Sequence, residues 1–284
     1  MIQTKAKLIK NIEVAPGYYK ICLSCAIIAR AAQPGQFLEV KVSIAAEPLL
    51  RRPFSIHRLN NATVEILFEV LGAGTKLLAE KKAGQYLDII GPLGNGFNYR
   101  SPSQPASPAG RHVTTSPLLV AGGMGVAPLL FLAEKLVTLP RRQAGRSSGH
   151  QVTRKPLVLI GAKTRNDILC ENEFRKLGCS VKIATDDGSV GFNGRVTDLL
   201  KKILLANQRT SEPANQIYAC GPGPMLKEVA AVAKKYNIPA QVSLEEHMAC
   251  GIGACLGCVV NTQDGFKRVC KEGPVFDAKE IVWG

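Results

Sequence analysis

The pattern of hydrophobic and polar positions changes its period near residue 117. In the first 98 residues, apolar and polar side chains alternate in short runs, as at 38–42, 64–69 and 87–89, and turn residues such as Pro34-Gly35 separate the runs. A period of two is typical of half-buried β-strands. Several short strands in succession predict an antiparallel β-barrel or sandwich over this part of the chain.

From residue 117 onward, short apolar runs alternate with longer segments of helical pattern. Strands are expected at 118–121, 157–161, 181–185, 216–219 and 241–244, and helices at 126–137, 167–177, 196–206 and 224–236. Strands separated by helices form parallel βαβ units. This half of the pattern predicts an α/β domain of the nucleotide-binding type.

Two polar segments interrupt these patterns. Residues 101–116 are rich in Pro and Ser and predict a long flexible loop or linker, and residues 139–156 form a second polar insertion. The chain therefore divides into a β-barrel at 1–100, an α/β domain at 117–244 and a small C-terminal module at 245–284.

The C-terminal module carries the most specific motif of the sequence. Cys250, Cys255 and Cys258 follow the spacing Cys-x4-Cys-x2-Cys, and Cys270 comes eleven residues later. This is the ligand spacing of a plant-type [2Fe–2S] cluster. The loop also holds three glycines, which let a backbone curl tightly and turn its N–H groups inward: Gly251, Gly253 and Gly257.

Zinc and disulfide bonding are the alternatives for these cysteines. A structural zinc site with four Cys ligands usually pairs two short Cys-x2-Cys knuckles, whereas here Cys270 stands alone. Residues 1–5 lack the apolar core of a secretory signal, which argues against disulfides. Five further cysteines and an iron–sulfur site predict a cytoplasmic protein, and no apolar run is long enough to span a membrane.

A formal net charge of +14, from 36 basic and 22 acidic residues, raises the question of nucleic-acid binding. Much of the excess lies in one polar stretch and no nucleic-acid motif accompanies it, so no nucleic-acid partner is expected. The residues concerned are Arg141, Arg142, Arg146, Arg154 and Lys155.

The barrel half contains two candidate phosphate sites. Arg52, preceded by Arg51 and followed by Pro53, Phe54 and Ser55, begins a strand, where a guanidinium can pair with a phosphate. Phe54 offers a flat apolar face and Ser55 a small donor, although an ordinary strand end explains the segment too. Residues 72–75 precede a helical stretch at 76–82 and offer backbone N–H groups to phosphate, or simply a turn capped by Thr75.

The α/β half contains two similar turns after predicted strands. Residues 122–128 and 220–225 each join a strand to a helix, so a ligand crevice is expected between them. The first turn departs from the G-x-G-x-x-G fingerprint because Pro128 replaces its last Gly, and Cys220 in the second could be a small buried side chain. Asp186 and Asp187 could bind a ribose or merely form a turn.

The order of these motifs resembles the ferredoxin–NAD(P) reductase superfamily and, within it, the electron-transfer subunits of class 1B dihydroorotate dehydrogenases. The likeness covers nearly the whole chain and is most specific at 245–258 and 269–276. Phe54 departs from the usual Tyr, and the insertions 101–116 and 139–156 lengthen loops that are usually short.

The resemblance implies three sets of cofactor residues and a candidate catalytic residue, Cys220. The FAD contacts would be Arg52, Pro53, Phe54, Ser55, Leu67, Phe68, Glu69, Gly74 and Thr75. The NAD contacts would be Gly122, Gly123, Gly125, Pro128, Gly221 and Pro222. The cluster ligands would be Cys250, Cys255, Cys258 and Cys270.

The resemblance also implies a role and a partner. Electrons would pass from the FMN of a dihydroorotate dehydrogenase catalytic subunit through [2Fe–2S] and FAD to NAD+, in pyrimidine (UMP) biosynthesis, within a heterotetramer of two plus two subunits. Phe266 and Arg268 are candidates for the interface because their loop flanks the cluster. A stand-alone or hydrogenase-type NAD(P)H–acceptor reductase and a colourless, zinc-stabilised interaction protein are the competing interpretations.

Overall fold

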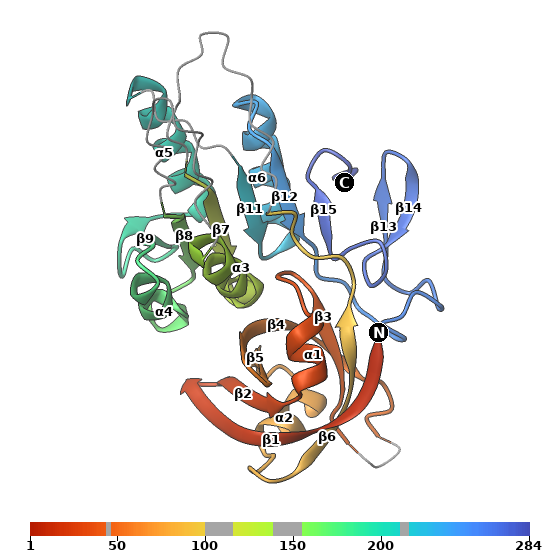
Figure 1. Cartoon of the computed structure of the whole chain (residues 1–284). Helices are drawn as coiled ribbons and strands as arrows, with labels where there is room; N and C mark the ends of the chain where they lie inside the picture. Colours follow the sequence, from red (N-terminus) through yellow and green to blue (C-terminus); the bar gives the residue numbers. More distant parts are fainter. Residues whose placement is uncertain (44–46, 100–115, 139–154, 211–215) are drawn as a thin grey trace, which may run out of the picture.

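The computed structural model describes residues 1–43, 47–99, 116–138, 155–210 and 216–284. Three parts are distinguishable in Figure 1: a barrel that contains the N-terminus, a sheet flanked by helices, and a small module that carries the C-terminus. Helix α3 (Val126–Thr138) lies between the sheet and the barrel. Both predicted insertions, at 101–116 and 139–156, fall almost wholly outside the described residues.

Six antiparallel strands close the barrel in the order β1-β2-β5-β4-β3-β6, which confirms the predicted fold of this half. Alternating side chains fill its interior, for example Leu38 and Val40, while Glu39 between them points outward. The strands are β1 (Ile2–Ala15), β2 (Tyr18–Ser24), β3 (Phe37–Lys41), β4 (Arg52–Asn60), β5 (Thr63–Glu69) and β6 (Tyr86–Leu93).

Two short helices accompany the barrel, α1 (Ala26–Ala31) and α2 (Ala73–Ala79). The sequence pattern did not predict α1, because a helix of six residues with one buried residue, Ile28, leaves too short a pattern. Helix α2 begins three residues before the predicted 76–82. The Thr75 hydroxyl accepts hydrogen bonds from the N–H groups of Leu71 and Gly72 at 2.9 and 3.1 Å, which starts the helix early.

The α/β half forms a seven-stranded sheet in the order β10-β9-β8-β7-β11-β12-β15. All pairs from β10 to β12 are parallel, as the sequence predicted. The strands are β7 (Leu118–Gly122), β8 (Leu157–Ala162), β9 (Ser180–Thr185), β10 (Phe192–Asn193), β11 (Ile217–Cys220) and β12 (Ala240–Ser243). The helices, besides α3, are α4 (Glu171–Lys176), α5 (Val196–Thr210) and α6 (Gly223–Lys235).

Helix α4 is shorter than the predicted helix at 167–177. Asp167 lies instead in a 3-10 turn (Arg165–Asp167), where its carboxylate accepts hydrogen bonds from the N–H and hydroxyl of Thr164 at 3.0 and 2.9 Å. Cys170 then takes a left-handed conformation with φ of 61° before the helix begins. An Asp that caps its own turn competes with the helix that a periodic pattern favours.

The C-terminal module contributes to the large sheet as well as to its own hairpin. Strand β15 (Val275–Asp277) pairs antiparallel with β12, while β13 (Val259–Thr262) and β14 (Gly265–Arg268) form a two-stranded sheet. The module is therefore joined to the α/β sheet by a hydrogen-bonded strand.

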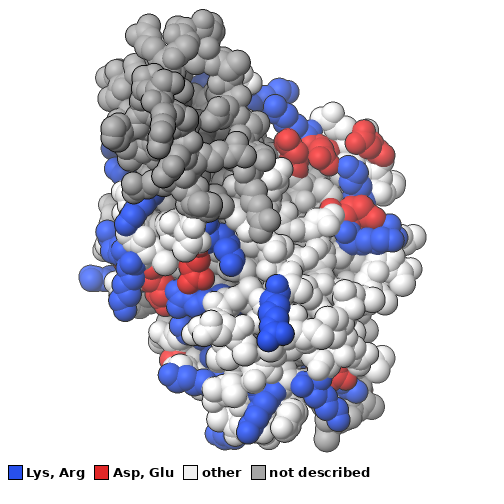
Figure 2. Space-filling view, in the orientation of Figure 1, with Lys and Arg blue, Asp and Glu red and all other residues white. Residues whose placement is uncertain are grey.

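The part of the chain that the structure describes contains no helix long and apolar enough to cross a membrane. On the face drawn in Figure 2, basic side chains are scattered with acidic ones among them rather than gathered in one patch. Of the basic residues singled out in the sequence, four lie outside the described residues: Arg141, Arg142, Arg146 and Arg154.

A buried histidine joins the barrel to α3. His57 on β4 is fully inaccessible to solvent, and its Nδ1 lies 3.1 Å from the Ala127 carbonyl oxygen. Because a carbonyl only accepts, Nδ1 carries the hydrogen, and Nε2 has no partner among the described residues. Burial is the main cause that lowers the pKa of His57 to about 4, so the ring is neutral at neutral pH.

This depressed pKa predicts a loss of stability in mild acid. The unfolded chain binds a proton near pH 6.5 and the folded chain only near pH 4, so stability falls as the pH drops through this window, by up to about 3 kcal/mol. His57→Gln should remove most of that dependence in chemical unfolding at pH 7.5 and pH 5. The exposed His247→Gln is the control, and an equal loss in the wild type and His57→Gln would refute the prediction.

Candidate functional site: a thiol loop between a barrel and a nucleotide-type sheet

The loop from Cys250 to Cys258 curls through three residues of positive φ. These are Gly251, Gly253 and Leu256, with φ of 66°, 84° and 58°. Left-handed residues at such close intervals turn the chain sharply and bring its N–H groups to the inside of the curve. The local sequence, rich in Gly, permits this path where most side chains would oppose it.

Backbone N–H groups donate to the thiol sulfurs, including that of Cys270 from Gly253. The N–H of Ala254 lies 3.3 Å from Cys250 Sγ, that of Gly257 3.4 Å from Cys255 Sγ, and that of Cys270 3.4 Å from Cys258 Sγ. Such donors favour a thiolate over a thiol. Cys258 and Cys270 are buried, while Cys255 is exposed.

The pKa values of the Cys250 and Cys270 thiols are shifted in opposite directions. Burial tends to raise the pKa of Cys250, but hydrogen bonds from the N–H groups of Ile252, Cys255 and Ala254, together with the Cys255 side chain, lower it to about 6. Burial and a hydrogen bond with Cys258 raise the pKa of Cys270 to about 12. A pKa of about 6 makes the Cys250 sulfur mostly a thiolate at neutral pH.

The four thiols interact with one another. Cys250 interacts with Cys255, and Cys270 interacts chiefly with Cys258 and also with Cys250. Among the residues that the structure describes, no three Cys, His, Asp or Glu side chains are grouped closely enough to hold one metal ion. Two irons that each take two thiolates require four thiols within reach of one another, which this loop and the Cys270 turn supply. The donor set and its N–H groups fit a [2Fe–2S] cluster.

A buried carboxylate on the barrel wall packs against this loop. Glu39 on β3 is fully inaccessible to solvent, and a Cβ on Gly251 would lie 2.3 Å from its Oε1. Neither carboxylate oxygen has a hydrogen-bond partner among the described residues. Burial raises the pKa of Glu39 to about 7, with Cys250 acting in the same direction and Arg51 and Arg52 against it. The thiol loop therefore lies directly against the barrel wall.

The two arginines at the start of β4 have different surroundings. Arg51 is bound by an ion pair of 2.9 Å to Asp88 and by a hydrogen bond to the Asp88 carbonyl. Arg52 donates to the carbonyl of Leu50 at 2.8 Å, and its guanidinium covers Gly74, where a Cβ would come within 3.0 Å of Nε. The structure thus brings Arg52 together with the Gly74-Thr75 turn, as a phosphate site requires.

The other predicted flavin contacts are spread over two faces of the barrel wall. Phe54 is buried in the barrel core, where its ring lies 5.5 Å from that of Phe68, so it does not offer the flat outer face that we expected. Leu67 is buried in the cluster between the barrel and the sheet, and Glu69 is half-buried beside Tyr18. Strand alternation explains the split, because neighbouring residues point to opposite faces.

The two predicted nucleotide turns meet at the carboxyl ends of β7 and β11. A Cβ on Gly125 would lie 2.0 Å from the Cys220 carbonyl oxygen, and one on Gly122 only 2.6 Å from Met225 Sδ. Gly221 is similarly enclosed, so these glycines let the two backbones touch. Gly123 has φ of 51° and open space where a Cβ would be, which leaves its backbone accessible to a ligand. Pro128 is buried in the first turn of α3.

Cys220 is buried beside a carboxylate that the sequence analysis did not single out. Its Sγ lies 4.0 Å from Oε1 of Glu245, which follows β12. Burial and then Glu245 raise the pKa of the Cys220 thiol, while Glu245 itself is exposed to solvent. The signal that could have revealed Glu245 is its position after a strand next to β11. A cavity of about 420 Å³ opens beside Glu245 and the turn at Pro222.

The acidic pair after β9 is partly explained by turn chemistry. Asp187 accepts a hydrogen bond from the N–H of Ser189 at 2.9 Å, and hydrogen bonds from Ser189 are the main cause that lowers its pKa. The N–H of Asp186 donates to the Ala162 carbonyl, and its side chain is exposed at the carboxyl edge of the sheet.

Comparison with known proteins agrees with this architecture. Residues 119–231 match the model of the oxidoreductase NAD-binding domain, and residues 245–282 match the iron–sulfur cluster binding domain of dihydroorotate dehydrogenase B. The NADH-dependent reduced ferredoxin–NADP oxidoreductase structure has a TM-score of 0.76 at 26% identity, over 98% of this chain and 90% of that one. The ferredoxin–NADP+ reductase of Neisseria gonorrhoeae has a TM-score of 0.62 at 16% identity, covering 82% and 91%.

Sequence relatives are similar over nearly the whole length. The dihydroorotate dehydrogenase B (NAD+) electron transfer subunit of Desulforamulus reducens is 38% identical over 98% of this chain and 97% of its own, and that of Bacillus caldolyticus is 40% identical over 95% and 94%. Barrel, parallel sheet and thiol loop define a flavin oxidoreductase of the ferredoxin–NADP reductase fold with an added iron–sulfur module. The chain belongs to the family of dihydroorotate dehydrogenase B electron transfer subunits.

The contact between Glu39 and Gly251 predicts that the loop cannot accept a side chain there. In Gly251→Ala, the new Cβ would lie 2.3 Å from the Glu39 carboxylate, and the residue would have to keep a φ of 66°. We therefore expect the loop to shift and the variant to lose bound iron to a chelator faster than the wild type. The measurement is the bleaching rate of the visible absorbance. Gly265→Ala is the control, since φ is 98° but no atom lies within 4 Å. Equal bleaching in both variants would contradict the expectation.

Proposed function

We propose that this chain carries electrons from the FMN of a dihydroorotate dehydrogenase catalytic subunit, through its own [2Fe–2S] cluster and FAD, to NAD+ in pyrimidine synthesis. An iron–sulfur cluster transfers single electrons, a flavin accepts single electrons and gives hydride, and NAD+ takes hydride. The observation that supports this proposal most directly is a contact between the two proposed sites. The thiol loop packs against Glu39 on β3, and the neighbouring strand β4 bears Arg52.

We assign the residues to three domains at 1–100, 117–244 and 245–284. Four thiolates would hold the cluster: Cys250, Cys255, Cys258 and Cys270. Arg52 and the Gly74-Thr75 turn would bind the FAD pyrophosphate, with Pro53 and Ser55 at the outer face of β4. The turns at 122–128 and 220–222 would bind NAD, with Cys220 and Glu245 beside the reacting ring. Burial keeps Cys220 a neutral thiol, which places a small, uncharged group there.

The catalytic partner would dock on the cluster module. The module exposes four apolar side chains that lie within four residues of a cluster cysteine in the sequence, Ile252, Leu256, Val259 and Phe266, of which Phe266 is 78% exposed. Exposed apolar side chains gathered beside a redox site are typical of an interface. Arg268, which the sequence also suggested, has its side chain bound within the module and is not part of this surface. We infer a complex of two subunits of each kind in the cytoplasm.

The FAD assignment predicts different effects for the two neighbouring arginines. Arg52→Ala removes a charge-assisted contact worth roughly 1.5–3 kcal/mol, so FAD should bind about 10- to 100-fold more weakly while the cluster absorbance stays. Arg51→Ala is the matched control, because Arg51 is bound to Asp88 and should affect stability rather than FAD affinity. Flavin retention on gel filtration and titration of the apoprotein measure the effect. Unchanged affinity in Arg52→Ala would mean that the guanidinium does not contact FAD.

Reconstitution with a catalytic subunit tests the whole proposal. The isolated chain should reduce an artificial dye with NADH and leave dihydroorotate unchanged, while addition of the FMN subunit should produce dihydroorotate-dependent NAD+ reduction. Phe266→Asp should weaken the complex by about tenfold or more without changing dye reduction. Tyr86→Asp, an exposed aromatic on β6, is the control.

Three results would count against this assignment. Dihydroorotate oxidation by the chain alone would overturn the division of roles. Failure of every FMN subunit from the same cell to restore NAD+ reduction would favour a stand-alone NAD(P)H–acceptor reductase. That second function is supported by the likeness to the NADH-dependent reduced ferredoxin–NADP oxidoreductase structure. If Phe266→Asp and the wild type bind the FMN subunit equally well, the interface does not lie on this surface.

A further inference from the structure

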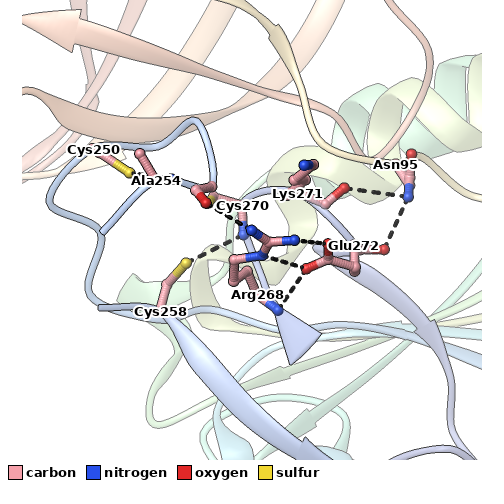
Figure 3. A network of polar contacts seen from close by, with 9 residues as sticks. Asn95, Cys250, Ala254, Cys258, Arg268, Cys270, Lys271 and Glu272 are labelled. Carbon is pink, nitrogen blue, oxygen red and sulfur yellow. Dashed lines mark hydrogen bonds and ion pairs between the residues drawn. The ribbon is translucent and has the colours of Figure 1, made fainter. Parts of the chain in front are cut away.

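Arg268, the last residue of β14, makes an unusual number of contacts for a half-exposed side chain. Its Nη1 donates to the Gly253 carbonyl at 2.8 Å, and its Nε donates to Glu272 Oε2 at 2.9 Å. Nη2 forms a second, parallel bond to Glu272 Oε1, which makes the ion pair bidentate. Figure 3 shows the guanidinium between the thiol loop and the segment that follows Cys270.

The backbone of Arg268 closes the turn that carries Cys270. Its carbonyl accepts from the N–H groups of Lys271, Glu272 and Gly273 at 3.2, 2.9 and 3.2 Å, and its own N–H donates to Glu272 Oε2 at 2.8 Å. Cys270 lies inside this closed turn. The position of its sulfur therefore depends on the contacts of Arg268.

The same residue is linked to the other cysteines. Arg268 pairs with Val259 across the hairpin, directly after Cys258, and the Val269 N–H donates to the Cys258 carbonyl at 2.9 Å. Gly253, whose carbonyl Arg268 holds, lies between Cys250 and Cys255. One side chain thus connects the loop of the first three cysteines to the turn of the fourth.

Glu272 extends this network to the barrel. The Asn95 side chain donates to the Glu272 carbonyl at 2.9 Å, and the Asn95 N–H donates to the Gly273 carbonyl at 2.5 Å. Asn95 follows β6, and Gly94 before it packs so closely that a Cβ would lie 2.6 Å from the Gly273 carbonyl oxygen. Figure 3 shows Asn95 approaching Lys271 and Glu272 from the barrel side.

From these contacts we infer that Arg268 is a positioning residue for the iron–sulfur site. Through Gly253 and Glu272, it fixes the thiol loop, the Cys270 turn and the barrel end in one arrangement, and so sets where the cluster lies relative to the flavin. The inference rests on the proposed ligand set. It requires the planar, forked guanidinium, because a lysine ammonium is a single point that cannot reach both acceptors with the same geometry.

A neighbouring ion pair supplies the comparison. Lys267 precedes Arg268 on β14, and its Nζ lies 2.8 Å from Glu280 Oε2 in the C-terminal segment. Successive strand residues point to opposite faces, so Lys267 faces away from the thiol loop. Exposed pairs of this kind contribute little to stability. The two positions share charge, strand and exposure but differ in their contact with the cysteine loops.

The experiment compares four forms of the full chain with its cofactors: wild type, Arg268→Gln, Arg268→Lys and Lys267→Gln. We expect Arg268→Gln to lose iron to a chelator about tenfold or more faster than wild type, as loss of an outer-sphere ligand contact typically causes. The electron paramagnetic resonance signal of the reduced cluster should broaden, and dye reduction through FAD should be unchanged. Arg268→Lys should resemble Arg268→Gln, and Lys267→Gln should match wild type.

The other possible results distinguish a failure of this inference from a failure of the proposed function. Wild-type behaviour of Arg268→Gln, or equal damage in Lys267→Gln, would overturn the positioning role. Full rescue by Arg268→Lys would also overturn it, since charge alone would then suffice. If Arg268→Gln assembles no cluster but retains FAD, Glu272→Gln provides the milder variant, and its wild-type signal would refute the inference. A wild-type chain without iron would instead refute the proposed function.

Discussion

The structure depends on one short segment, Glu272 to Asp277, which contacts all three parts of the chain. Its first carbonyls accept hydrogen bonds from Asn95 at the end of the barrel, Pro274 forms a bridge to Asn95, and β15 pairs with β12 of the sheet. A shift of this segment would move the Cys270 turn against the barrel and the sheet together. Backbone contacts of this kind are short and directional, so they fix relative position more firmly than side-chain packing alone.

Three glycines lie in close contact with a distant part of the chain. Gly125 touches the Cys220 carbonyl, Gly94 touches the Gly273 carbonyl, and Gly251 touches Glu39. In each case a methyl group would push apart two surfaces that touch in the structure. Glycine is thus used at the junctions between parts as much as within turns, and the cofactor sites that we propose lie at those junctions.

Glu39 and His57 are buried on the outer wall of the barrel. Glu39 packs against the thiol loop and His57 against α3, and each has a side-chain polar atom with no hydrogen-bond partner among the residues that the structure describes. Desolvation drives both groups toward their neutral forms, by raising the pKa of the acid and lowering that of the base. The barrel can therefore bury them against other parts of the molecule without burying two full charges.

Local patterns in the sequence determined the barrel, the parallel sheet, most helices and the spacing of the four cysteines, because each depends on residues close together in the chain. Long-range contacts decided the rest. Only the fold shows that Arg51 is bound to Asp88 while Arg52 covers Gly74, that Phe54 points inward, and that Glu245 approaches Cys220. Arg268 looked like a surface residue because spacing does not reveal which way a strand end faces. Its partners, Gly253 and Glu272, are brought to it only by the folding of the loop and the turn around the cysteines.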